Sequence, residues 1–108
     1  MNNGLPEFYE KVKEKYPEIW EKYRDLGAAL GEFPGVNPKT QHLVKLAIAV
    51  GAGSEGALHS HVRRARDAGV SDDEIRHTAL LAITTIGWPR AMAALSWIED
   101  LLNDPKAG

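Results

Sequence analysis

The chain has 108 residues and a net charge of −2, with 13 lysines and arginines, 15 aspartates and glutamates, and no cysteine. Without cysteine, disulfides, zinc–thiolate centres and thiol redox chemistry are excluded. Charges of both signs are interspersed, and no apolar run approaches the ~20 residues of a membrane-spanning helix. We therefore expect neither a nucleic-acid partner nor a membrane partner.

A chain of this size is expected to form a single domain over residues 1–108. Its first residues, MNNGLPEFYEKV, lack the basic start and the apolar centre of a secretory signal. We therefore expect a cytoplasmic protein.

The N-terminal third of the sequence predicts two helices. The first covers residues 5–15, and the second begins at Pro17, because proline is tolerated in the first turn of a helix. In the second helix Ile19, Tyr23 and Leu26 share one side, whereas charged side chains face away. The stretch GEFPGV that follows is typical of a loop.

The middle of the sequence predicts a central helix over about residues 38–51. Asn37 has the side chain of an N-cap, and Pro38 suits the first helical position. The helix is apolar on nearly every side, as expected for an element packed on several neighbours. Gly51 and Gly53 mark its end.

Three more helices are expected after this point. Ser54 is a plausible N-cap for a fourth helix that stops at Gly69, and Ser71 with Glu74 forms a capping box for a fifth. The fifth helix contains the apolar stretch TALLAITTI, and the tripeptide GWP ends it and starts a sixth. No segment shows the two-residue alternation of a strand, so the sequence predicts an all-α bundle of about six helices. Three of them are apolar on more than one side, which favours a homo-oligomer.

The octapeptide SEGALHSH, residues 54–61, holds two histidines whose directions differ. His61 falls on the apolar stripe of the fourth helix, three residues after Leu58, whereas His59 lies about 200° away. Residues two apart on a helix do not face each other, so the pair is not expected to chelate one metal ion. We expect His59 to be a solvated surface residue. Ser54 is interpreted as a cap rather than a nucleophile, because about 10 Å of helix axis separates it from His61.

Three interpretations of His61 stay open at this point. It can be a buried histidine with one satisfied hydrogen bond, or a general acid/base whose pKa is shifted by its surroundings. His42 and His77, each near the start of an apolar helix, could converge on the same region. In that case three imidazoles from different helices could bind zinc or copper.

Several motifs in residues 37–98 occur in an order that resembles the carboxymuconolactone decarboxylase family, which includes the AhpD-like alkylhydroperoxidases. The motifs are "PKT…L…LAIAV", the helix–turn–helix HVRRARDAGVSDDEI, and the break GWPRA. The resemblance implies a helical fold that assembles into trimers or hexamers, with sites near the subunit contacts.

The peroxidase branch of the family carries the pattern Glu-x11-Cys-x2-Cys-x3-His. In this chain the two cysteines fall on Ser54 and Ala57, the glutamate on His42 and the histidine on His61, so only His61 matches. No side chain here can reduce a peroxide by disulfide cycling.

The decarboxylase branch also lacks the cysteine pair and keeps the histidine. The resemblance therefore implies decarboxylation or a related lyase reaction, without a cofactor, on a small carboxylated or cyclic substrate. His61 would be the acid/base and His42 would assist it. The candidate substrate-binding residues are Arg63, Arg64, Arg90 and His77. The alternative hypothesis is a family member without catalytic activity, a helical oligomer that binds a small molecule or a protein partner.

Overall fold

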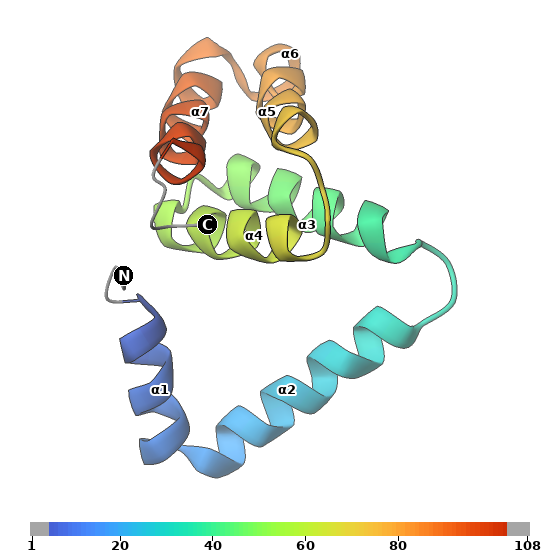
Figure 1. Ribbon diagram of the computed structural model, residues 1–108, viewed down its shortest axis with the longest axis vertical. Coiled ribbons are helices and arrows are strands. Elements are labelled where there is room, and N and C mark those ends of the chain that lie inside the picture. Colours follow the sequence, from blue (N-terminus) through green and yellow to red (C-terminus); the bar gives the residue numbers. More distant parts are fainter. Residues whose placement is uncertain (1–4, 104–108) are drawn as a thin grey trace. The chain divides into compact units, whose positions relative to one another are not determined.

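A computed structural model of the chain describes residues 5–103. Within this range the chain forms seven α-helices and no strand (Figure 1). The helices are α1 Leu5–Lys15, α2 Pro17–Glu32, α3 Pro38–Ala52, α4 Glu55–Asp67, α5 Asp72–Leu81, α6 Ile83–Ile86 and α7 Trp88–Leu102. The expected all-α fold is confirmed. None of these helices combines the length and the apolar character needed to cross a membrane.

The chain divides into two compact units, one ending at Val36 and one beginning at Asn37. The first unit holds α1 and α2, which contact each other. At that contact the Lys13 ammonium lies 5.0 Å from the ring centroid of Trp20, a distance at which cation and ring attract. No residue of α2 is buried, and its apolar side chains, such as Ile19 and Leu26, remain exposed.

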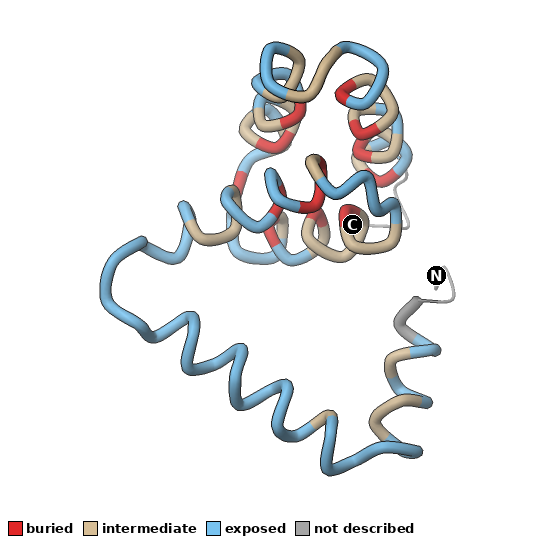
Figure 2. Tube along the Cα trace, turned by 180° about the vertical axis from the view of Figure 1, so that it is seen from behind, coloured by how far each residue is buried: buried red, intermediate tan, exposed pale blue. Residues whose placement is uncertain are grey.

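The second unit contains the hydrophobic core, and Figure 2 shows the buried positions confined to α3, α4, α5, α7 and the turn after α4. Helix α4 packs against both α3 and α7, and α5 packs against α7 and α3. The core consists mainly of small and branched apolar side chains, which allow close helix packing. Its buried members are Leu46, Ala49, Val50, Leu58, Val62, Ala65, Val70, Ile75, Ala79, Ala94, Ile98 and Leu101.

Side-chain caps fix three helix starts in the second unit, as the sequence predicted. The Asn37 Oδ1 accepts a hydrogen bond from the Thr40 N–H at 2.9 Å, and the Ser54 Oγ accepts one from the Ala57 N–H at 3.3 Å. Ser71 and Glu74 form the complete capping box. Each cap satisfies an N–H group that has no partner inside its own helix.

The predicted fifth helix is divided into α5 and the short α6. At the boundary the Ala82 N–H donates to the Ala79 carbonyl at 3.1 Å, an i to i−3 bond in place of the α-helical i to i−4 bond. This tighter turn interrupts the α-helical pattern, although Ala82 keeps right-handed helical dihedrals. The apolar stretch TALLAITTI therefore spans two helices instead of one, and its composition gives no sign of the boundary between them.

Polar contacts join α5 to its neighbours at two points. Arg76 donates to both carboxylate oxygens of Glu99 on α7, at 2.7 and 3.1 Å, and Lys39 of α3 lies 2.6 Å from the Glu74 carboxylate. The hydrogen bond from Arg76 lowers the pKa of Glu99, and the hydrogen bond from Lys39 lowers that of Glu74. These contacts fix α5 beside α3 and α7, which positions the groove described below.

Candidate functional site

His61 lies at the edge of the α3–α4 interface, where the sequence placed it on the apolar stripe. Its neighbours Leu58, Val62 and Ala65 are wholly buried, but His61 itself is only half-buried. Within residues 5–103 its imidazole makes no hydrogen bond to another protein group. A buried structural histidine normally has such a partner. The imidazole nitrogens of His61 are therefore available to form a hydrogen bond with a water molecule or a ligand.

The surroundings of His61 are cationic. Burial lowers the pKa of its imidazole, and electrostatic interactions with Arg64, Lys45 and His42 lower it further. Arg64 follows His61 by nearly one turn of α4, whereas Lys45 and His42 come from α3. The structure thus brings His61 and His42 into electrostatic contact. Lys45 is a further member of this site that the sequence analysis did not name. Its position three residues after His42, on the same side of the helix, was the signal that could have identified it.

The other two predicted arginines have different positions. Arg90, at the start of α7, donates from Nη1 to the Gly51 carbonyl at 2.9 Å. This contact satisfies a carbonyl in the last turn of α3, which has no partner within the helix. Arg63 begins about 200° around α4 from His61, on the side of His59. Arg64 is therefore the arginine that the fold brings to His61.

His77 lies in a groove on another side of α3. The groove encloses about 530 Å³ and is mostly apolar, with Glu74, His77 and Thr78 as its polar members. Neither His61 nor His42 borders it, so the three histidines do not share one site. The lining residues come from α3, α5, α6 and the residue between the last two: Leu43, Val44, Ala47, Val50, Gly51, Glu74, His77, Thr78, Leu81, Ala82, Thr85 and Ile86.

The two positions of the family's cysteines have structural roles. Ser54 caps α4, as expected, and its exposed hydroxyl is used in that cap. Ala57 is half-buried and packs against the core. Neither side chain offers a nucleophile with an adjacent base.

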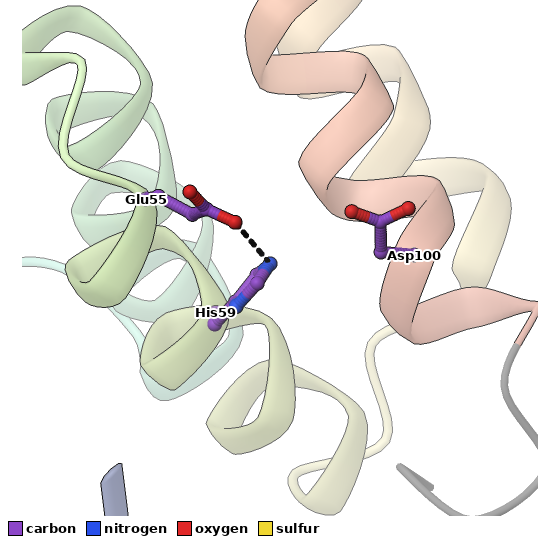
Figure 3. Close-up of side chains that lie close together, drawn as sticks. All are labelled: Glu55, His59 and Asp100. Atoms are coloured by element: carbon purple, nitrogen blue, oxygen red, sulfur yellow. Dashed lines mark ion pairs between the residues drawn. The ribbon is translucent and has the colours of Figure 1, made fainter. Parts of the chain in front are cut away.

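The prediction for His59 is wrong. Its side chain is only 16% exposed, and its Nε2 atom is buried without a hydrogen-bond partner. The atom lies 3.9 Å from the Glu55 Oε2 of the preceding turn, and the Asp100 carboxylate of α7 is close to both (Figure 3). Ligand atoms of these three residues lie within 4.8 Å of one another, and no other set of three potential metal ligands is this close in the described part of the chain. His59 is not solvated as predicted because α7 packs against this side of α4.

The fold and the site together define a class: a small all-α protein with a histidine, and no cysteine, at the site on α4. The sequence profile of the carboxymuconolactone decarboxylase family matches residues 16–100. The chain belongs to this family. The match begins within the first unit and includes α2, so it is longer than the 37–98 segment that carries the motifs.

Two relatives are similar to this chain over about two thirds or more of its length. A 4-carboxymuconolactone decarboxylase from Acinetobacter baylyi is 31% identical over 71 residues, which are 66% of this chain and 53% of that protein. An uncharacterized protein from Methanocaldococcus jannaschii, MJ0742, is 26% identical over 91 residues, which are 83% of this chain and 88% of that protein. The chain thus spans about half the length of the Acinetobacter enzyme.

Proposed function

We propose that this protein is a carbon–carbon lyase that removes a carboxylate from a small carboxylated or cyclic substrate without a cofactor. His61 is the acid/base of the reaction. The observation that carries the proposal is the position of this half-buried imidazole, which has no hydrogen-bond partner among the described residues and lies near the cationic side chains of Arg64 and Lys45 and near His42. Membership of the family and the similarity to a 4-carboxymuconolactone decarboxylase support a decarboxylase-like reaction.

Arg64 and Lys45 are the proposed carboxylate-binding groups. Both are exposed, so a ligand can reach them from solvent, and both lie close enough to influence the charge of His61. Charge-assisted hydrogen bonds to a carboxylate are stronger than neutral ones. His42 adds a third polar group to the same side of α3 and would assist by orienting the substrate.

The lowered pKa of His61 suits proton delivery to carbon. In the free protein the imidazole is mostly neutral at neutral pH, because burial and the nearby cations disfavour its protonated form. A bound carboxylate compensates those cations, and His61 then takes up a proton from solvent. When the bond between the substrate carbon and its carboxylate breaks, carbon dioxide leaves and the electron pair stays on the substrate as an enolate. His61 gives its proton to that carbon and becomes neutral again.

The test is release of carbon dioxide from a panel of carboxylated lactones, measured with the purified protein. Replacing His61 by Asn should lower kcat/KM by about 10²–10⁴-fold, the usual contribution of a general acid or base. Asp67→Asn, on the exposed side of the same helix, is the matched control and should retain activity. If His61→Asn decarboxylates as fast as the unchanged protein, the proposed role is wrong. A peroxidase assay with a dithiol reductant should give no turnover, because the chain has no cysteine.

A homo-oligomer is part of this proposal. The apolar side chains Phe33 of the loop after α2 and Ile48 of α3 are 73% and 65% exposed in the single chain, and apolar surface of this kind favours association. Light scattering coupled to gel filtration should give a mass that is a multiple of the 11.9 kDa monomer. A monomer at micromolar concentration would contradict the proposal.

The groove between α3, α5 and α6 favours a second candidate function, the binding of a small apolar molecule without catalysis. It has the mainly apolar lining and the few polar groups that are typical of ligand sites. Calorimetry with apolar acids and lactones would separate the two candidates. Binding that is weakened by Ala47→Trp in the groove but not by His61→Asn, without release of carbon dioxide, would favour this second function.

A further inference from the structure

We infer that Glu55, His59 and Asp100 form a binding site for a divalent transition-metal ion, with zinc as its representative. This site lies on the α4–α7 side of the second unit and shares no residue with the proposed lyase site or with the groove (Figure 3). It does not depend on the proposed function.

The local geometry of α4 supplies two of the ligands. Glu55 and His59 are one turn apart, so both side chains project from the same side of the helix. The Glu55 Oε2 and the His59 Nε2 are 3.9 Å apart, which is longer than a hydrogen bond. Ligand atoms around a tetrahedral zinc ion lie about 3.3–3.4 Å apart, because each is about 2.0–2.1 Å from the metal. A small rotation of either side chain closes that difference.

Asp100 supplies the third ligand from α7. Its carboxylate faces the Glu55–His59 pair across the contact between the two helices, and the ligand atoms of all three residues lie within 4.8 Å. One nitrogen and two carboxylate oxygens form a donor set that zinc and other first-row divalent ions accept. Glu55 is 55% exposed, which leaves room for water as a fourth ligand and a path for entry of the ion.

Two independent features support a cation at this point. First, the His59 Nε2 is buried without any hydrogen-bond partner, a costly state for a polar atom unless something binds it. Second, Glu55 and Asp100 bring two negative charges together, and no lysine or arginine of residues 5–103 forms an ion pair with either. A divalent cation would bind the nitrogen and neutralise both carboxylates.

The experiment is titration of the metal-free protein with Zn²⁺ by calorimetry and with Co²⁺ by visible absorption, which reports coordination directly. We expect saturable binding of one ion per chain and a rise in Tm with zinc concentration. Asp100→Asn preserves the shape of an exposed side chain and should weaken binding by at least tenfold, since even loss of a group behind a ligand costs about 10–100-fold. His59→Gln should abolish the cobalt spectrum.

Two controls complete the experiment. Asp67→Asn on α4 and His77→Gln on α5 each remove a comparable side chain outside the cluster, and both should bind the ions like the unchanged protein. Unfolding curves without metal establish that each variant is folded. The inference is overturned if the unchanged protein does not bind either ion, if Asp100→Asn binds as tightly, or if a control variant loses binding to the same extent.

Discussion

The two sides of α4 present histidines in opposite electrostatic surroundings. On one side, His61 lies near the cations of Arg64 and Lys45 and near His42, with its pKa lowered chiefly by burial. On the other side, His59 lies between the carboxylates of Glu55 and Asp100. The difference teaches that the chemistry of an imidazole is set by the helix that covers it. Helix α3 brings cations to His61, and α7 brings a carboxylate to His59.

The largest expected effect follows from shortening Leu58, the buried side chain of α4 that lies between these two histidine-bearing sides. Leu58 is wholly buried where α4 meets the core. Leu58→Ala should lower the free energy of unfolding by about 2–5 kcal/mol, because lost burial and a residual cavity both contribute. Leu58→Met keeps the volume and should cost less than about 1.5 kcal/mol. Urea unfolding measures both free energies. Equal midpoints for the two variants would show that the packing of Leu58 does not hold α4 against the core.

The next effect tests the cationic side alone. Arg64→Gln and Lys45→Gln should each raise KM for a carboxylated substrate by about tenfold or more, since hydrogen bonds to charged groups contribute about 1.5–3 kcal/mol. Arg63→Gln, one residue away on the other side of α4, should change KM less. Steady-state kinetics on the three variants decides the matter. A larger effect from Arg63 would place the substrate on the side of α4 that carries His59 and would contradict the proposed site.

A smaller effect is expected from the cap that starts α4 and sets the turn bearing Glu55. Ser54→Ala removes the acceptor for the Ala57 N–H and should destabilise the protein by about 1 kcal/mol. Ser54→Gly should cost only a few tenths of a kcal/mol, because glycine is itself a favourable N-cap. Thermal or urea unfolding of the two variants compares them. If alanine is no worse than glycine, the observed cap contributes nothing to stability.

The smallest effect concerns pH. The pKa of His61 is lowered in the folded state, so between that value and the ordinary 6.5 the unfolded chain binds more protons than the folded one. This part of the stability is therefore present above pH 6.5 and is lost as the pH falls toward the folded pKa. His61→Asn should flatten the pH dependence of unfolding in that window. An NMR titration should also show the pKa of His61 rising toward its ordinary value in Arg64→Gln; a pKa that does not move would exclude Arg64 as a neighbour.

Local signals explain why most of the fold was predictable. A cap is formed by residues three positions apart, so Asn37, Ser54 and Ser71 could be recognised without knowledge of the tertiary structure. The stripe of α4 was predictable for the same reason, since its spacing depends only on the helical repeat. The break at Ala82 was not, because nothing in its composition distinguishes a tight turn from a continuing helix.

The candidate site was predictable only in part. The place of His61 on the apolar stripe followed from helical phase, whereas its proximity to His42 was only one of the possibilities that the sequence left open. In the structure His42 lies close enough to His61 to lower its pKa. The possible convergence of His77 on the same region is not observed, because α5 places His77 in the groove on another side of α3. Lys45 and Asp100 were missed since each acts on a residue of another helix, at a separation along the chain that no local pattern encodes.

By itself, the sequence determined the helical class, the capped starts of α3, α4 and α5, the absence of cysteine chemistry and the 200° between His59 and His61, because each depends on composition or on contacts within a few residues. The tertiary structure alone decided which directions around α4 are covered and by which charges. Helical periodicity gives the angle of a side chain, but only the packing of α3 and α7 determines whether that angle leads to solvent, to cations or to carboxylates.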